Sequence, residues 1–319
     1  MKFEITLALT TTATGAQIDL FSFLAHGGLP ITVRIAPTYN QIMNRAKSWS
    51  KHLPSQLAQN DTAQGRILAA MLGLRHPKPL IVPDLTDETE HDPKKLLNSE
   101  QLQTFRYILN REAKILDQDA PCGAGKTFAV AIAIAELLKN DDGVNVVLTT
   151  RNNAGLKRLV EETVDLLGYN ESLVILSGTA KELYADDFEP YRPRLLVAAA
   201  EELVERMSES KGKSFLVNYI EECRSRPKKA SEKQALSVME QHKHDFPRVT
   251  FLTLAMLEDL DLITSKATHI IVDEAGQAAI DQLVPIICKS PHLQQMVYTG
   301  GERQLLNYVQ DIPDFVRDF

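Results

Sequence analysis

The sequence is poor in cysteine and aromatic residues, and it has no long apolar run. Its three cysteines lie far apart with no Cys-x-x-Cys pair, so neither a disulfide framework nor a structural zinc site is predicted. This cysteine usage is typical of an intracellular, reducing compartment, the cytoplasm or the nucleus. No stretch approaches the roughly 18 apolar residues that cross a bilayer. The apolar patch at residues 5–9 is short and follows Glu4, which argues against a secretory signal.

An excess of basic charge is also missing. The chain has 35 Lys and Arg residues against 42 Asp and Glu residues, a net charge of -7. A dedicated duplex-DNA binder usually carries a basic excess. Residues 1–97 hold 10 basic against 8 acidic residues, and residues 98–319 hold 25 against 34. Any contact with nucleic acid is therefore expected to be local.

The first 96 residues read as an accessory segment. Three β-prone stretches, at residues 3–9, 18–24 and 31–35, alternate with Gly and Pro. Two helical patterns follow, one around residues 42–49 and one around 67–72. Prolines and an acidic run over residues 77–95 then indicate a linker. We place a domain boundary near residue 96.

From residue 97 onward, helical and strand patterns alternate, which favours an α/β fold with a parallel sheet. Helices are expected at 99–111, 126–139, 153–167, 255–261 and 278–287, and strands at 113–118, 145–150, 249–253, 268–272 and 295–299. Residues 178–245 read as a helical insertion. Its basic cluster could grip nucleic acid or form a solvated helix face; the cluster comprises Arg224, Arg226, Lys228, Lys229 and Lys233.

A phosphate-binding loop is predicted at residues 119–127, DAPCGAGKT. Gly125, Lys126 and Thr127 fit the P-loop pattern, whereas Ala120 stands at its first glycine. Backbone N–H groups at the start of the next helix can bind phosphate oxygens. Lys126 would reach the β and γ phosphates of ATP, and the Thr127 hydroxyl would ligate Mg²⁺. The alternative is an ordinary glycine-containing turn.

The loop residues predicted to bind nucleotide are Ala120, Pro121, Cys122, Gly123, Ala124, Gly125, Lys126 and Thr127. Cys122 could fill the loop as a small residue or act as a redox switch.

An acid pair is predicted to follow a buried strand in ATHIIVDEAGQ, residues 267–277. Asp273 would hold Mg²⁺, and Glu274 would activate the attacking water. Such a pair is often only a solvated loop. The P-loop upstream favours the functional interpretation.

The residues DEAGQ resemble motif II of superfamily 1 helicases of the type that includes senataxin and the nonsense-mediated-decay helicase. Further matches occur in order, namely LNSEQ at 97–101, VVLTTRNNA at 146–154, VTFLTLAML at 249–257 and MVYTGGERQLL at 296–306. The first resembles the adenine-reading motif and assigns Gln101 to the base. Its alternative role is a helix cap with Asn98.

The resemblance implies that residues 97–319 form the first RecA-like domain of a P-loop NTPase that uses ATP and Mg²⁺. Gln304 would act in catalysis by sensing the γ-phosphate, together with Lys126 and Glu274. Thr150, Asn152 and Thr253 would contact single-stranded RNA or DNA, and RNA is slightly favoured by analogy. Residues 1–96 would correspond to the end of an accessory barrel and its stalk helices.

Two departures from the family pattern affect the expected activity. The motif at 296–306 usually begins Gly-Asp, and here Gly301 replaces the acid. The family also uses an arginine from a second RecA-like domain, which this sequence does not contain. We therefore expect low activity for this chain alone and a second domain supplied elsewhere.

The enzyme class stays open between a helicase-type ATPase and a non-catalytic regulatory or scaffold protein that binds ATP. A P-loop kinase or metabolic NTPase does not account for DEAGQ and GGERQL together.

Overall fold

The computed structural model describes residues 6–8, 32–34, 62–72, 74, 96–110, 112–121, 123–167, 173–175, 186–225, 232–242, 247–278 and 280–301. The β-prone stretch at 18–24, the helical pattern at 42–49 and the linker lie outside these residues. Two of the predicted N-terminal strands are present as β1 (Thr6–Ala8) and β2 (Thr32–Arg34), which pair in parallel.

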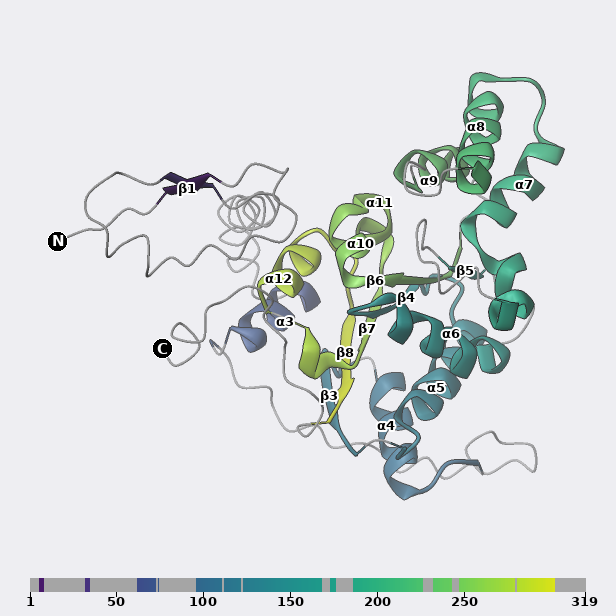
Figure 1. The fold of residues 1–319 in the computed structure, drawn as a ribbon. Helices are drawn as coiled ribbons and strands as arrows, with labels where there is room; N and C mark the ends of the chain where they lie inside the picture. The colour runs from purple at the N-terminus through teal and green to yellow at the C-terminus, as the bar shows by residue number, and fades with distance from the viewer. Residues whose placement is uncertain are drawn as a thin grey trace.

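A six-stranded parallel sheet forms the centre of the fold (Figure 1). Its order is β3-β8-β7-β4-β6-β5. The strands are β3 (Ile115–Asp119), β4 (Val146–Thr150), β5 (Leu173–Ile175), β6 (Val249–Thr253), β7 (His269–Asp273) and β8 (Gln295–Gly300). The predicted α/β fold with a parallel sheet is confirmed. Strand β8 is the last strand of this sheet in the sequence, and it lies between β7 and β3, the first strand of the sheet in the sequence.

Helices cover both faces of the sheet because alternate strand residues point to opposite faces. Ile270 and Val272 of β7 join one apolar cluster, and Ile271 joins the other. The first face is covered by α3 (Ala63–Met71), α10 (Leu254–Asp259), α11 (Asp261–Lys266) and α12 (Ile280–Cys288), and the second by α4 (Ser99–Leu109), α5 (Lys126–Asn140) and α6 (Asn153–Leu167). The predicted helices at 99–111, 126–139, 153–167, 255–261 and 278–287 are thus confirmed within a few residues.

Helix α5 lies between α4 and α6 on the second face. Small residues allow this close packing, since Ala129, Ala131 and Ala133 are fully buried. No helix in the described part of the chain combines the length and the apolar character needed to span a bilayer.

Helix α3 packs on the same α/β core, although its residues were predicted to belong to the accessory segment. Ile67 and Leu68 are fully buried, and the Gln64 side-chain amide donates a hydrogen bond to the Ile287 carbonyl in α12. These contacts tie α3 to the core across the boundary predicted near residue 96.

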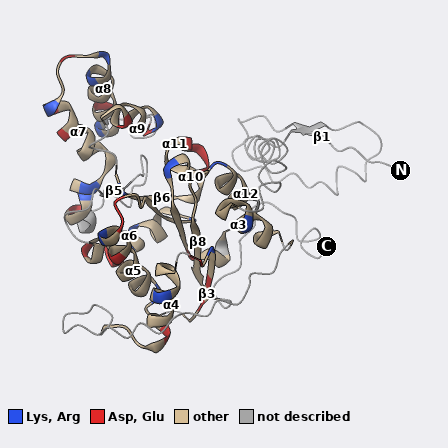
Figure 2. Cartoon of the chain, turned by 180° about the vertical axis from the view of Figure 1, so that it is seen from behind, with Lys and Arg blue, Asp and Glu red and all other residues tan. Residues whose placement is uncertain are grey.

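The predicted insertion is helical and separates β5 from β6. It contains the 3₁₀ segment η3 (Asp186–Arg194), α7 (Leu196–Arg206), α8 (Lys211–Ser225) and α9 (Glu232–Gln241). Both basic and acidic residues occur along these helices (Figure 2). Arg224 of the basic cluster pairs with Glu201 at 2.7 Å. Arg226, Lys228 and Lys229 lie outside the described residues.

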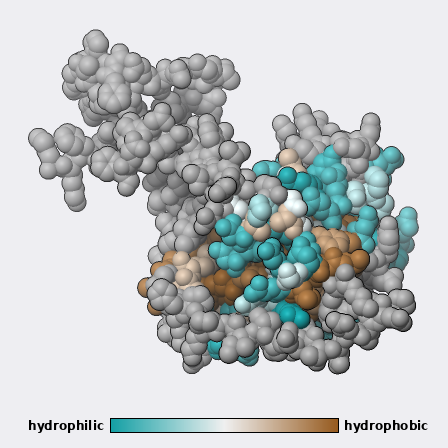
Figure 3. All heavy atoms as spheres, turned by 90° about the horizontal axis from the view of Figure 1, so that it is seen from below, coloured by the Kyte–Doolittle hydropathy of each residue, from teal (hydrophilic) through white to brown (hydrophobic). Residues whose placement is uncertain are grey.

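Most large apolar side chains of the described residues are at least partly buried. The exposed ones are Leu74 and Leu96, at 66% and 71%. On the face drawn in Figure 3, apolar areas alternate with hydrophilic side chains.

We expect Leu68→Ala to lower the free energy of unfolding by about 2–5 kcal/mol, because it removes a fully buried side chain and leaves a cavity. The control is Leu74→Ala, an exposed position just beyond the same helix, where a change within about 0.5 kcal/mol is expected. Urea denaturation of both variants tests this. Equal stability of the two variants would show that α3 is not part of the cooperative core.

Candidate functional site

The carboxyl ends of three adjacent strands meet at one edge of the sheet. In the parallel register, Asp119 of β3 lies opposite Gly300 of β8, and Asp273 of β7 lies opposite Thr299. The loop after β3 is the predicted phosphate-binding loop, and the residue after β7 is Glu274. The fold therefore brings together two motifs that lie almost 150 residues apart in the sequence.

The loop at 119–127 needs its glycines. Gly123 and Gly125 have φ angles of 79° and 74°, in the left-handed region where glycine avoids the steric penalty of a Cβ. A Cβ on Gly125 would also lie 2.3 Å from Gln101 Nε2. The backbone can thus turn sharply into α5, whose N-cap is Gly125.

Lys126 is the first residue of α5 and is 8% exposed. Its Nζ donates hydrogen bonds to the carbonyls of Ala120, at 2.7 Å, and Pro121, at 3.0 Å. These two partners are neutral carbonyls, which phosphate oxygens could replace. Thr127 follows and is half-buried.

Gln101 is the third residue of α4, where it takes part in capping the helix, and it also contacts the loop. Its Oε1 accepts a hydrogen bond from the Asn98 backbone N–H, and the Asn98 side chain accepts one from the Gln101 backbone N–H, which completes a capping box. Its Nε2 donates to the Ala124 carbonyl at 2.9 Å. The capping alternative is thus present, and the contact with adenine stays a prediction.

Asp273 is 7% exposed and accepts a hydrogen bond from Thr299 Oγ1 at 2.7 Å. Burial raises the pKa of Asp273, while the Thr299 hydrogen bond and the charges of Arg158 and Lys126 act in the opposite direction. Thr299 was not predicted, because a threonine inside an apolar strand carries no signal of its partner.

Glu274 stands in a left-handed conformation with φ of 53°. For a residue other than glycine, this backbone is strained and is often found at functional sites. The Glu274 carboxylate forms an ion pair with Arg158 of α6. Arg158 was also not predicted, since 116 positions separate the two residues.

The side chains fit a magnesium ion bound together with a nucleotide. Mg²⁺ is usually held by one or two protein oxygens, with phosphates and water completing its shell. Thr127 and Asp273 supply a hydroxyl and a carboxylate at the same edge. Among the residues that the structure describes, no group of three or more His, Cys, Asp or Glu residues could form an all-protein cage.

The residues predicted to contact nucleic acid have structural roles. Thr150 is fully buried, Asn152 Oδ1 accepts a hydrogen bond from the Gly155 N–H at 2.8 Å, and Thr253 caps α10. Their predicted contacts are untested. Cys122 and Gln304 lie outside the described residues.

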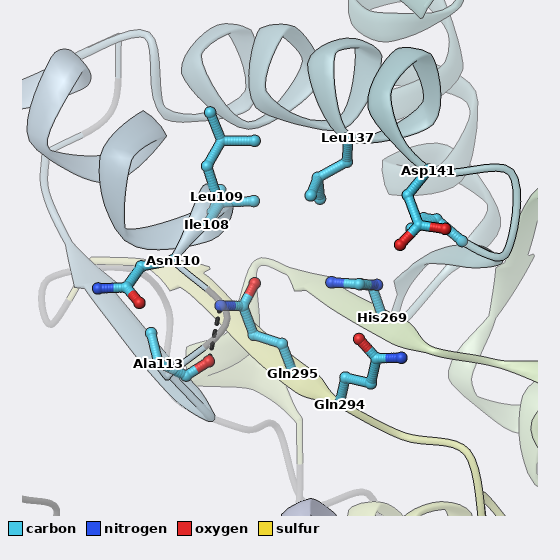
Figure 4. A pocket seen from close by; sticks show the side chains of 10 residues that line it. Ile108, Leu109, Asn110, Ala113, Leu137, Asp141, His269, Gln294 and Gln295 are labelled. Carbon is cyan, nitrogen blue, oxygen red and sulfur yellow. Dashed lines mark hydrogen bonds between the residues drawn. The ribbon is translucent and has the colours of Figure 1, made fainter. Parts of the chain in front are cut away.

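A small cavity lies at the opposite edge of the sheet (Figure 4). Its lining includes His269 at the start of β7, Gln295 at the start of β8 and Asn110 after α4. A volume of about 20 Å³ leaves room for about one water molecule. The cavity is therefore separate from the candidate site.

A comparison with known proteins relates the chain to an RNA helicase. No family model matches it. It is 26% identical over 220 residues, 67% of its length, to "Probable RNA helicase armi" of Drosophila melanogaster, and spans 17% of that protein. Its fold resembles the crystal structure of T4 UvsW with a TM-score of 0.39 and 13% identity, covering 64% of this chain and 29% of the other. The narrower senataxin-like assignment stays a prediction.

Gly301 touches the phosphate loop. The Gly300 carbonyl accepts a hydrogen bond from the Ala120 N–H at 3.0 Å. A Cβ on Gly301 would lie 2.9 Å from the Ala120 carbonyl oxygen, closer than real Cβ contacts. That carbonyl also holds Lys126.

Gly301→Asp would supply the acid usual in the resembling family, yet we expect it to weaken ATP binding and to cost about 1–3 kcal/mol of stability. The backbone carbonyl cannot move without shifting Lys126. Titration with a fluorescent ATP analogue and thermal unfolding measure the two effects. Gly276→Ala is the stability control, since its nearest contact would be 3.8 Å away. Tighter nucleotide binding by Gly301→Asp would contradict this view of the loop.

Proposed function

We propose that residues 97–319 form an ATP-binding, Mg²⁺-dependent NTPase domain of a senataxin-like superfamily 1 helicase acting on single-stranded RNA or DNA. The observation that carries the proposal is the meeting of Lys126 and Asp273 at one sheet edge. Both are largely buried, and the charge of Lys126 acts on the pKa of Asp273. The match to an RNA helicase over 220 residues supports the same reading.

Each side chain would have one task. Lys126 would exchange its two carbonyl partners for oxygens of the β and γ phosphates, and the N–H groups at the start of α5 would bind the same phosphates. Thr127 and Asp273 would hold Mg²⁺, which neutralises charge on the transferring phosphate. Glu274 would orient the attacking water and accept its proton.

A non-catalytic scaffold that binds ATP is the second candidate. One observation favours it, since Arg158 holds Glu274 Oε1 in an ion pair, so that a cation competes with water for this carboxylate in this conformation. The two candidates differ in turnover. An enzyme releases phosphate faster when nucleic acid is added, whereas a scaffold binds ATP without such release.

Lys126→Ala is expected to weaken ATP binding by about 10- to 100-fold, since charged hydrogen bonds to phosphate contribute about 1.5–3 kcal/mol. The control is Lys139→Ala, an exposed lysine in the last turn of the same helix, which should bind ATP like the unaltered chain. Fluorescent-analogue titration measures both, and thermal unfolding verifies that each variant is folded. Unchanged affinity in Lys126→Ala would refute the phosphate-loop assignment.

Glu274→Gln is expected to keep ATP binding and to lower phosphate release by about 10²- to 10⁴-fold, because the amide cannot accept a proton from water. Phosphate release is measured with and without oligouridylate or oligothymidylate. If the unaltered chain binds ATP and its phosphate release equals that of Glu274→Gln both with and without a strand, the scaffold candidate replaces the enzyme.

A further inference from the structure

The ion pair between Arg158 and Glu274 joins two functional regions of the candidate site. Glu274 follows β7 beside the buried Asp273, and its side chain is 15% exposed. Arg158 lies in the second turn of α6, and its side chain is 56% exposed. One partner thus belongs to the sheet edge that would hold the nucleotide, and the other reaches solvent.

Helix α6 is firmly attached to the loop predicted to touch a nucleic-acid strand. Asn152 in that loop caps the helix through its 2.8 Å hydrogen bond to Gly155. Gly155 packs directly on Thr150, because a Cβ there would lie 2.8 Å from Thr150 Oγ1. A strand phosphate that arrives at this loop would therefore approach the same rigid unit that carries Arg158.

Guanidinium groups bind carboxylate and phosphate with the same planar set of donors. The exposed Arg158 can therefore exchange one anion for another without leaving its helix. While it holds Glu274 Oε1, the guanidinium competes with a water molecule for the lone pairs of that oxygen. After the exchange, this cation would no longer compete with water for the carboxylate.

We propose that Arg158 contacts a phosphate of the bound strand, and that this contact competes with its ion pair to Glu274, so that strand binding releases the catalytic carboxylate. The inference rests on the proposed function and adds a residue that no motif assigns. It also explains the ion pair of Glu274 with Arg158 in an enzyme, so this ion pair need not indicate a non-catalytic scaffold protein.

The coupling is reciprocal, since a group that competes with the strand for Arg158 must weaken strand binding. Glu274→Gln removes this competitor. We expect it to tighten binding of labelled oligouridylate by about two- to fivefold in the absence of nucleotide. Arg158→Ala should weaken binding, and Glu274→Gln should have no further effect in the Arg158→Ala background. Fluorescence anisotropy measures all four proteins.

Lys157→Ala is the matched control, because it removes the neighbouring cation of α6, which pairs with Glu161 at 3.7 Å. In that background, the tightening by Glu274→Gln should persist. Equal tightening in the Arg158→Ala background would reveal a general charge effect and overturn the inference. The same four proteins can be titrated with an ATP analogue in the absence of a strand. If the effect of Glu274→Gln on analogue binding also depends on Arg158, the inference is overturned, since the competing phosphate would then belong to the nucleotide.

Phosphate release provides a second measurement. Arg158→Ala should raise release without a strand by about two- to fivefold and reduce the stimulation by oligouridylate. Lower release without a strand would mean that Arg158 positions Glu274 for catalysis, which contradicts the inference. Failure of the proposed function would give a different result. None of these proteins would then hydrolyse ATP, but strand binding could still show coupling between Arg158 and Glu274. If no variant binds a strand, both proposals are refuted.

Discussion

The pairing of β8 with both β3 and β7 is the constraint on which the candidate site depends. Because the strands are parallel, their carboxyl ends share one edge, and the outer two are two strand spacings apart, about 10 Å. This separation lets the charge of Lys126 act on Asp273. A shift of β8 by one residue would turn its side chains to the other face and remove Thr299 from Asp273.

The residues at this edge of the sheet reduce the stability of the fold. An ammonium and a carboxylate are largely buried there, and burial of charge is unfavourable without compensating partners. Glu274 adds a strained backbone. The interior of the sheet has the opposite character, since β4 and β7 are buried along their whole length. Local features that oppose stability are thus concentrated where chemistry is proposed, as expected for a functional site.

The sequence predicted what depends on local patterns. Helix α6 was expected at 153–167 and is found there, because its apolar residues recur at helical spacing. The three-residue strand β5 and the short helix α11 are too short for periodicity to reveal. The partners of α3 could not be predicted, since its apolar face fits any apolar surface.

The side-chain partners within the site were equally hidden. A glutamine three residues after an N-cap gives the same pattern for a capping box and for a base-reading residue, so Gln101 kept two roles. Its contact with the Ala124 carbonyl, 23 positions away, belongs to neither pattern. The Arg158–Glu274 and Thr299–Asp273 pairs likewise join residues that only the folded sheet brings together. Sequence patterns predicted the candidate reactive groups but not the residues that hold them.

Two positions that depart from the expected motifs, Ala120 in the P-loop pattern and Gly301 in the motif at 296–306, are structurally connected. Alanine at position 120 restricts the backbone more than the glycine usual there, and its carbonyl holds Lys126. The same carbonyl points to the space that a Cβ at 301 would need. With the Ala120 carbonyl in this position, only glycine fits at position 301 without a shift of the backbone. The missing acid is consistent with packing against the loop at 119–127, so its absence does not by itself argue against the proposed nucleotide binding.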